Sequence, residues 1–197
     1  MNRTRLQQQV DFILEIDRLK TINRRTYLTD TSRFENSAEH SWHIAVMALI
    51  LAEHADDANI DLLKVIRMLL IHDLVEIDAG DTFIYDQAAH SDKQAREQAA
   101  AERLFQMLPP DQAADLRAAW EEFEARLTPE ARFAGALDRF QPMLHNIHTR
   151  GRAWRENGIH KAQVLAVNRH MAEGAPSLWD FAVSGVEQAA SHGDLPE

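Results

Sequence analysis

The chain has 197 residues and a formal net charge of −10, with 21 Lys and Arg against 31 Asp and Glu. This length suggests one domain that can bury its own core. The absence of Cys excludes disulfide frameworks, thiolate zinc sites and cysteine nucleophiles. The acidic balance gives the chain no overall attraction for a nucleic acid polymer or an anionic membrane.

The sequence shows neither a membrane-spanning segment nor a signal peptide. No apolar run approaches the roughly 20 residues that span a bilayer. The opening MNRTRLQQQVDF lacks the apolar core of a signal peptide. We therefore expect a cytoplasmic protein that makes no membrane contact.

The composition favours helices over strands, because 29 Ala and 20 Leu stand against 8 Val and 12 Ile. No Gly precedes Gly80 and no Pro precedes Pro109, so polar residues and caps must separate the early helices. The chain shows no repeat and no linker. We expect a single all-α domain over residues 1–197, with a core of about 12–150 that carries the motifs.

The first helices are predicted from the spacing of apolar residues. Residues 5–20 carry a helical apolar stripe, and 21–35 lose it and are predicted as a connection. The tetrapeptide 36–39 (NSAE) matches a capping box, and the apolar run HSWHIAVMALILAEHA that follows it predicts a buried central helix. A third, nearly all-apolar helix is predicted over 62–77, with Gly80 at its C-terminal cap.

The second half of the chain is also predicted to be helical. The polar stretch at 82–92 (TFIYDQAAHSD) is predicted as an ordered loop. Proline near the first turn marks the start of two of the helices that follow, after Leu108 and after Leu127. The predicted helices cover 92–107, 111–127, 129–149, 159–173 and 177–190.

Pro142 falls inside the predicted helix 129–149, four residues after Asp138. It has no N–H for the Asp138 carbonyl, and its ring crowds that carbonyl. We therefore expect a kink or local opening within one turn of Asp138. The alternative is a helix that starts later, with Pro142 in its first turn.

His72, Asp73 and Glu76 carry the clearest chemical signal, since they lie in the apolar run MLLIHDLVEI. A single buried His is usually a satisfied core residue, but a carboxylate in such a run costs several kcal/mol unless something pairs with it. The spacing lets all three side chains project toward one side of a helix. Two acids and an imidazole in an apolar setting call for a cation, and ligands of these types without thiolates suit Mn, Co, Fe, Ni or Zn.

His40 and Asp138 are the candidates for further ligands. His40 begins the second predicted helix, whose start lies near His72 if the two helices pack antiparallel. Asp138 is flanked by apolar residues in FAGALDRFQPML. For Asp138 the alternative is a half-exposed residue paired with Arg139 or Arg132.

These residues, in this order, resemble a known family. His40, then His72-Asp73, then Asp138 follow the H…HD…D pattern of the HD-domain metal-dependent phosphohydrolases. The resemblance is greatest to the subgroup of 5′-deoxynucleotidases and covers roughly residues 12–150. The segments similar to that subgroup are LKTINR at 19–24, ENSAEHS at 35–41, HDLVE at 72–76 and the dipeptide Gly80-Asp81.

The resemblance implies a helical bundle of the HD-domain type that binds a divalent metal ion: Co, Mn, Ni, Fe, Zn or Mg. It implies hydrolysis of (deoxy)nucleoside 5′-monophosphates to nucleoside and phosphate, and a homodimer to which the apolar stretch at 178–181 contributes. The residues with implied roles are His40, His72, Asp73 and Asp138 as metal ligands, Glu76 and Asp81 at the attacking water and the leaving group, and Arg24 and Asp81 in substrate binding, with Arg24 on the phosphate. This agrees with the chemistry, because a metal activates water, a carboxylate accepts its proton and an arginine binds phosphate through paired donors.

The sequence leaves several alternatives open. The family has an aromatic residue soon after its arginine, whereas Arg25 follows Arg24 directly here, and the interval from Arg24 to His40 is one residue longer than expected. Arg25 is therefore an alternative phosphate binder, and a solvated basic pair ahead of a loop would account for both arginines. His43 either faces the pocket or packs beside Trp42. His145 is predicted to be a structural or surface residue rather than a metal ligand.

Two other functions compete with the nucleotidase. One is hydrolysis of a nucleoside triphosphate or a pyrophosphorylated nucleotide, against which we find no second basic cluster near the motif. The other is a non-catalytic HD protein that binds a nucleotide. A pure binder would not need Glu76 and Asp81 beside the four ligands.

Overall fold

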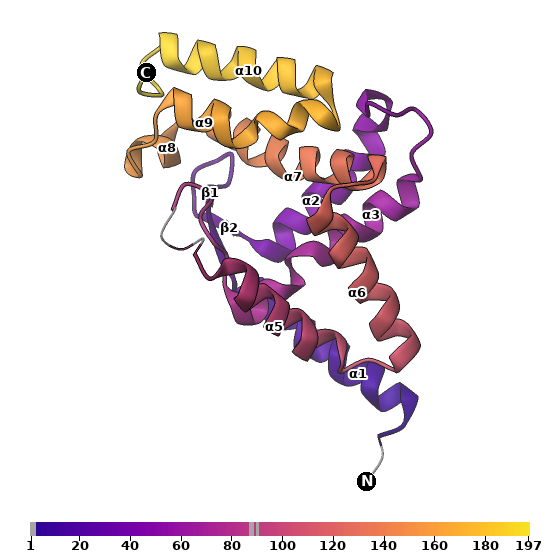
Figure 1. Cartoon of the computed structure of the whole chain (residues 1–197). Coiled ribbons are helices and arrows are strands. Elements are labelled where there is room, and N and C mark those ends of the chain that lie inside the picture. Colours follow the sequence, from indigo (N-terminus) through magenta and orange to yellow (C-terminus); the bar gives the residue numbers. More distant parts are fainter. Residues whose placement is uncertain (1–2, 87–88, 90) are drawn as a thin grey trace.

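Helices account for most of the chain in the computed structural model, which describes residues 3–86, 89 and 91–197. The all-α prediction is confirmed, with one addition (Figure 1). Two short strands, β1 (Asn23–Tyr27) and β2 (Phe34–Asn36), pair antiparallel within the segment predicted as a plain connection. No helix in the described part of the chain is long and apolar enough to cross a membrane.

The capping box at the start of helix α2 (Ser37–Leu51) is confirmed. The Glu39 amide donates to the Asn36 side chain at 3.0 Å, and the Asn36 amide donates back to the Glu39 carboxylate at 3.1 Å. The prediction that α2 is buried on all sides is wrong in part, because its outward face exposes Trp42, Leu49 and Ile50. The inward face packs on α3 (Leu62–Ile71).

The predicted helix over 62–77 is divided at its chemically important end. After α3 the chain tightens into a 3₁₀ turn, His72–Val75, and then forms the short α4 (Glu76–Ala79). Gly80 ends α4 as predicted: it adopts φ of 75°, and its amide donates to the Glu76 carbonyl at 2.8 Å. A 3₁₀ turn inside a helical run often marks a functional site.

The remaining helices lie close to their predicted ranges. In place of a helix over 159–173 there are α9 and a 3₁₀ segment, and the short α8 was not predicted. In the predicted loop 82–92, residues 87, 88 and 90 lie outside the described part of the chain. The elements not yet named are α1 (Arg5–Ile16), α5 (Lys93–Phe105), α6 (Pro110–Ala125), α7 (Pro129–His148), α8 (Arg152–Glu156), α9 (Lys161–Asn168), α10 (Pro176–Ser191) and 3₁₀ segments at Asp17–Thr21, Ala52–His54 and Arg169–Glu173.

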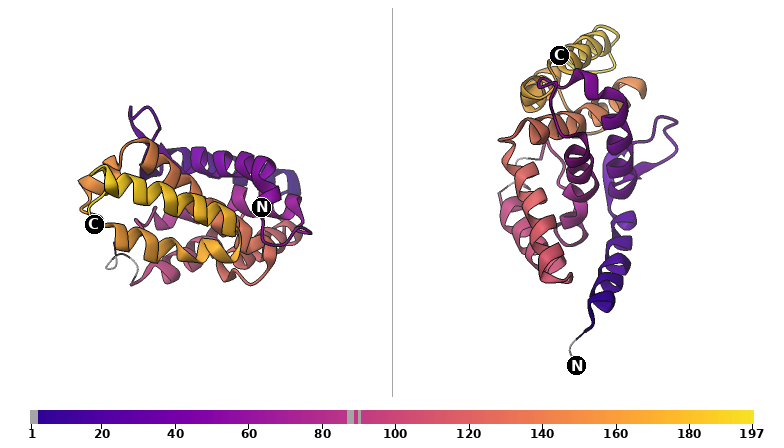
Figure 2. Two further views of the ribbon diagram at one scale, coloured as in Figure 1. Left: turned by 90° about the horizontal axis from the view of Figure 1, so that it is seen from above. Right: turned by 90° about the vertical axis from the view of Figure 1, so that its right-hand side faces the viewer.

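Two clusters of buried apolar side chains hold these helices together. The larger joins α2, α3 and α7 to the C-terminal helices, and the smaller joins α1, α5 and α6. The ribbon views show the C-terminal helices at one end of the molecule and α1 extending toward the other (Figure 2). Leu69 belongs to the larger cluster and Ile71 to the smaller. His72 and Asp73 therefore follow at the boundary between the two, where buried polar groups can meet without interrupting either cluster.

Helix α7 passes through Pro142 without a break. The predicted local opening is therefore wrong, and so is the alternative of a later helix with Pro142 in its first turn, whereas the kink at Pro142 stays a prediction. Although Pro142 cannot donate to the Asp138 carbonyl, the buried contacts of α7 on both sides of it hold the helix together. The Pro142 carbonyl accepts a second donor, the Asn146 side chain, at 2.9 Å.

Candidate metal centre and active site

His72 lies in the 3₁₀ turn after α3, where one ring nitrogen hydrogen-bonds to the backbone and the other faces two carboxylates. Nδ1 donates to the Leu69 carbonyl at 2.9 Å, which leaves Nε2 unprotonated in the neutral ring. Nε2 is buried and has no hydrogen-bond partner among the described residues. It lies 3.0 Å from Asp73 Oδ1 and 3.6 Å from Asp138 Oδ1.

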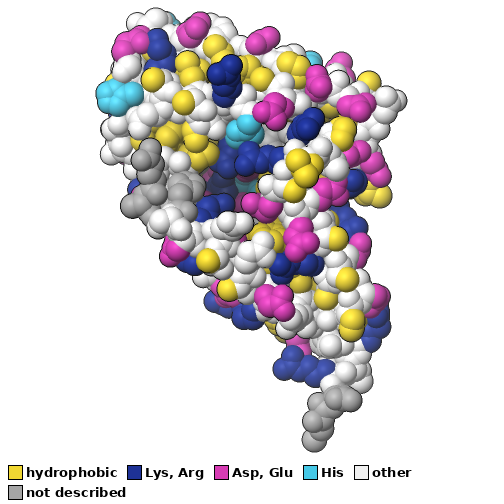
Figure 3. Space-filling model, viewed as in Figure 1, with side chains coloured by type: hydrophobic (Ala, Val, Ile, Leu, Met, Phe, Trp, Pro, Cys, Tyr) yellow, Lys and Arg dark blue, Asp and Glu magenta, His cyan; other side chains and the backbone are white. Residues whose placement is uncertain are grey.

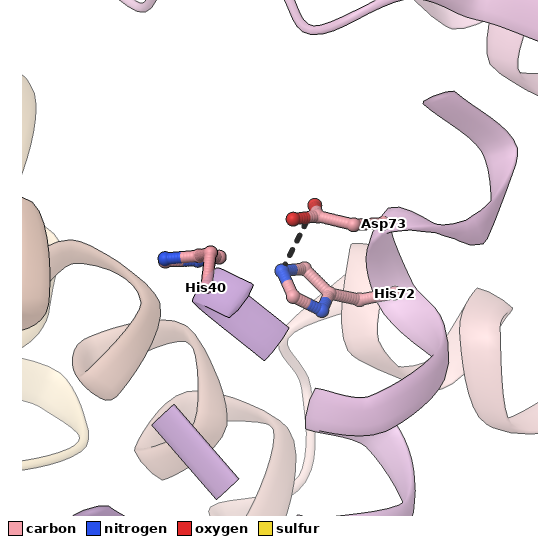
Figure 4. Close-up of side chains that lie close together, drawn as sticks. All are labelled: His40, His72 and Asp73. Carbon is pink, nitrogen blue, oxygen red and sulfur yellow. Dashed lines mark ion pairs between the residues drawn. The ribbon is translucent and has the colours of Figure 1, made fainter. Parts of the chain in front are cut away.

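His40 reaches the same point from the first turn of α2. It is fully buried, with Nδ1 3.2 Å from Gln141 Oε1 and Nε2 3.0 Å from Asp138 Oδ1. The ligand atoms of His40, His72 and Asp73 all lie within 4.8 Å of one another (Figure 4). The structure therefore brings the four predicted ligands together from α2, the 3₁₀ turn and α7.

Asp138 is not the half-exposed residue of the alternative interpretation. It is 7% exposed, and its Oδ1 faces both imidazoles. Its other oxygen, Oδ2, lies 3.5 Å from Arg139 Nε. Burial by itself would raise the pKa of Asp138, but Arg139 and the two histidines hold that pKa well below its usual range.

The two buried imidazoles have pKa values that move in opposite directions. Burial and the nearby Arg24 guanidinium lower the pKa of His40 to about 4. For His72 burial also acts downward, but the Asp73 and Asp138 carboxylates outweigh it and raise the pKa to about 10. The two carboxylates thus create a demand for positive charge at His72 Nε2, the atom that both of them face.

Arg24 extends from β1 into the same group of acids. Its NH1 nitrogen lies 2.9 Å from Asp73 Oδ2 and 4.0 Å from both Glu76 Oε1 and Asp81 Oδ1. Its Nε lies 3.6 Å from Glu35 Oε1. The three predicted catalytic and substrate-binding residues are therefore adjacent to the four predicted ligands.

Glu76 and Asp81 are carboxyl groups in surroundings that favour the protonated form. Burial and Asp73 raise the pKa of Glu76 well above its ordinary value, and the Ser37 hydroxyl donates to Glu76 Oε2 at 2.5 Å. Burial raises the pKa of Asp81 as well. Carboxyl groups with raised pKa values exchange protons closer to neutral pH, as general acid–base chemistry requires.

Arg25 lies in the same pocket but away from the acids. Side chains alternate along a strand, so Arg25 leaves β1 on the side opposite to Arg24. Its guanidinium sits 5.1 Å from the centre of the Phe83 ring and donates to Asn157 Oδ1 at 3.3 Å. Of the two arginines, Arg24 is the one beside the predicted ligands.

A buried hydrogen-bond chain behind His40 was missed at the level of sequence. Gln141 is fully buried, faces His40 through Oε1 and donates from Nε2 to Glu35 Oε2 at 2.8 Å. Its Nε2 also lies 3.2 Å from His145 Nε2 and 3.3 Å from His43 Nδ1. His145 is structural, as predicted, because its Nδ1 donates to the Tyr27 carbonyl at 3.1 Å.

The hydrogen bonds of Gln141 fix the orientation of His40. A glutamine Oε1 only accepts, so His40 carries its proton on Nδ1 and turns an unprotonated Nε2 toward Asp138. The signal was present in the sequence, since Gln141 follows Asp138 by three residues and shares its helix face.

Comparison with known proteins places the chain in a family. An HD-domain family model matches residues 16–179, and the chain belongs to the HD-domain family. It is 30% identical over 136 residues to the 5′-deoxynucleotidases HDDC2 of Xenopus laevis and Homo sapiens, covering 68% of this chain and 66% and 65% of theirs. The chain thus spans slightly less than two thirds of the length of these relatives.

Solved structures give the same result. A protein from Magnetospirillum magnetotacticum, described as a predicted metal-dependent phosphohydrolase, superposes with a TM-score of 0.93 at 53% identity over 98% of this chain and 96% of that one. A conserved hypothetical protein from Pyrococcus furiosus, 21% identical, shares the fold with a TM-score of 0.60 over 92% of this chain and 99% of that one. The resemblance expected from the motifs is confirmed.

Replacing Gln141 with Leu tests the buried hydrogen bonds that Gln141 makes to His40 and Glu35. The change removes the partners of the His40 Nδ1–H and of Glu35 Oε2, and each buried group left unpaired costs about 1–3 kcal/mol. Urea unfolding should therefore show a loss of several kcal/mol. The exposed Gln188→Leu should shift the free energy of unfolding by about 0.5 kcal/mol or less, and equal effects of the two changes would contradict the assignment.

Proposed function

We propose that the chain is a metal-dependent phosphohydrolase that converts (deoxy)nucleoside 5′-monophosphates to nucleoside and phosphate. One observation carries the proposal. Two histidines and two carboxylates converge on a buried point beside Arg24, next to a pocket lined by residues of β1, α7 and the segment after α4. The names of the HDDC2 relatives, 5′-deoxynucleotidase, support the substrate class.

The proposed ligands are His40 Nε2, His72 Nε2 and carboxylate oxygens of Asp73 and Asp138. The fit rests on the buried His72 Nε2, which faces the Asp73 and Asp138 carboxylates, and on the Nδ1 hydrogen bonds of both histidines, which leave each Nε2 available to a metal ion in place of a proton. Imidazoles beside carboxylates favour a first-row transition ion such as Mn, Co, Fe, Ni or Zn over Mg, which prefers oxygen ligands.

Each remaining residue has a defined task. A divalent ion bound there would lower the pKa of a water molecule and polarise a phosphoryl oxygen. In the ionised form that a nearby divalent ion would favour, Glu76 accepts the proton of the attacking water at Oε1, because Ser37 occupies Oε2. Asp81 supplies a proton to the departing 5′-oxygen, and its raised pKa suits that role.

Arg24 binds the phosphate. With Asp73 committed to a cation, the Arg24 guanidinium exchanges that carboxylate for phosphate oxygens, which it meets with paired donors. Arg25 makes no ion pair with any carboxylate in the described part of the chain and stays at the pocket wall.

A second candidate function follows from a correction to the sequence analysis. The sequence shows no second basic cluster near the motif, but folding brings Arg25, Lys93 and Arg139 to the same pocket. These residues favour hydrolysis of a nucleoside triphosphate or a pyrophosphorylated nucleotide as the alternative. A panel of mono-, di- and triphosphates, assayed with and without Mn and Co, separates the two.

Asp73→Ala should abolish metal content and phosphatase activity together, because a ligand is lost from an enclosed site. Elemental analysis of the purified protein and a phosphate-release assay measure the two effects. Asp180→Ala, on the exposed face of α10, is the matched control. A full complement of transition metal in the Asp73 variant would exclude the site as proposed.

Glu76→Ala should separate binding from turnover. Metal content and substrate affinity should stay near those of the unchanged protein, while kcat falls roughly 10²–10⁴-fold. Steady-state kinetics and elemental analysis on the same sample measure both. Loss of the metal would make Glu76 a ligand rather than the base.

We also propose that the chain forms a homodimer. The C-terminal stretch expected to contribute is only partly available, since Leu178 is buried in the core, although Phe181 is 62% exposed. The exposed apolar face of α2, with Trp42, Leu49 and Ile50, is the larger candidate surface. Sedimentation at micromolar concentration should give a dimer for the unchanged chain and a monomer for Trp42→Glu; a monomer in both would contradict the proposal.

A further inference from the structure

The pocket that holds the proposed metal site has a second end made of aromatic and amide side chains. The lining includes Asp73, Glu76 and Asp138, and it also includes Phe83 and Trp154. The space-filling view shows this face hollowed, with Lys and Arg side chains around and within the hollow (Figure 3). We call Phe83, Tyr85, Asn146 and Trp154 the aromatic end.

The aromatic end is a firmly held wall. The rings of Phe83 and Tyr85 meet edge to face with centroids 5.2 Å apart. Hydrogen bonds join the Tyr85 hydroxyl to Trp154 and Asn168 from the C-terminal part of the chain, and burial raises the pKa of that hydroxyl. Arg25 covers the Phe83 ring at 5.1 Å. Nucleobases stack on aromatic rings and guanidinium planes of this kind.

The Asn146 side chain carries a buried acceptor atom, Oδ1, that receives no hydrogen bond from the described residues. Its Nδ2 donates to the Pro142 carbonyl at 2.9 Å, and this bond fixes which amide atom is Oδ1. The residue is only 8% exposed, and Oδ1 has no hydrogen-bond partner among the described residues. Buried polar atoms are nearly always paired, so this acceptor indicates that a ligand supplies the missing N–H.

The spacing along α7 matches the length of a mononucleotide. Asn146 follows Asp138 by eight residues, which corresponds to about 12 Å along the helix axis. This is about the span from a phosphate to the far edge of its base. Pro142 and Met143 line the pocket between them and offer apolar surface to the sugar.

The part of the lining that comes from α5 and α6 offers no buried, unpaired acceptor among its described residues, and its one aromatic ring, Phe123, packs on His72 with centroids 4.7 Å apart. It consists of Lys93, Glu97, Phe123 and Glu124, and Lys93 is paired with Glu97 at 2.8 Å. None of their side-chain polar atoms is both buried and unpaired in the described structure. The aromatic end is therefore the better seat for a base.

We propose, on the basis of the proposed function, that the aromatic end is a nucleobase subsite. Phe83 stacks on the face of the base, and Asn146 Oδ1 accepts an N–H from its edge. Because each common base carries such an N–H, the subsite distinguishes nucleotides from sugar phosphates rather than one base from another.

The test compares two substrates that differ only in the base: 2′-deoxyadenosine 5′-monophosphate and 2-deoxyribose 5-phosphate. The measured quantity is the ratio of their kcat/KM values, so damage shared by both substrates cancels. Asn146→Ala and Phe83→Leu should each lower this ratio about tenfold, the loss expected for one hydrogen bond or one stacking contact. Phe83→Tyr, which keeps the ring, should restore it, and the remote surface change Asn59→Ala should leave it unaltered.

An unchanged ratio in both the Asn146 and the Phe83 variants would overturn the subsite. Calorimetry with deoxyadenosine, which has no phosphate, tests the same contacts without any reaction: its affinity should fall about tenfold in the Asn146→Ala protein. Equal affinity would overturn the subsite even in an active enzyme. A chain that hydrolyses neither phosphomonoester but binds deoxyadenosine through Asn146 would overturn the proposed function and leave the subsite supported.

Discussion

Two carboxylates and two imidazoles share a buried point, and much of the structure follows from that constraint. Asp73 and Asp138 face His72 Nε2 at 3.0 and 3.6 Å, and that nitrogen has no other partner in the described structure. Burying two anionic groups together is unfavourable unless positive charge joins them. Arg24, Arg139 and a raised pKa at His72 meet that need in part. A divalent cation would meet it in full and, under the proposed function, would leave Arg24 free for a phosphate.

The residues that surround this point come from segments far apart in the chain. The capping box orients the first turn of α2 and hence His40, the 3₁₀ turn at the boundary between the apolar clusters presents His72 and Asp73, and α7 brings Asp138. Glu35 and Gln141 connect these parts from behind, since Glu35 lies near Arg24 and Gln141 bonds to both Glu35 and His40. Gln141 thereby sets the tautomer of His40, as residues behind the ligands of a metal commonly do.

The sequence predicted what depends on local patterns. Apolar spacing located most of the helices, the capping box was confirmed at Asn36, and the ordered motifs indicated the four candidate ligands before any geometry was known. The hairpin at β1 and β2 was missed because its residues are polar and its pairing depends on the helices beneath it. The 3₁₀ turn and the unbroken path through Pro142 were missed because tertiary packing overrides local preference at both places. The roles of Gln141 and Asn146 needed partners that only folding brings together.

Anomalous X-ray diffraction from crystals grown with Mn or Co tests the central claim most directly. The account predicts one strong peak within about 2.0–2.3 Å of His40 Nε2, His72 Nε2 and oxygens of Asp73 and Asp138. The His72 Nδ1–H should still donate to the Leu69 carbonyl. A peak elsewhere, or an empty cluster with Arg24 still bound to Asp73 at saturating metal, would contradict it.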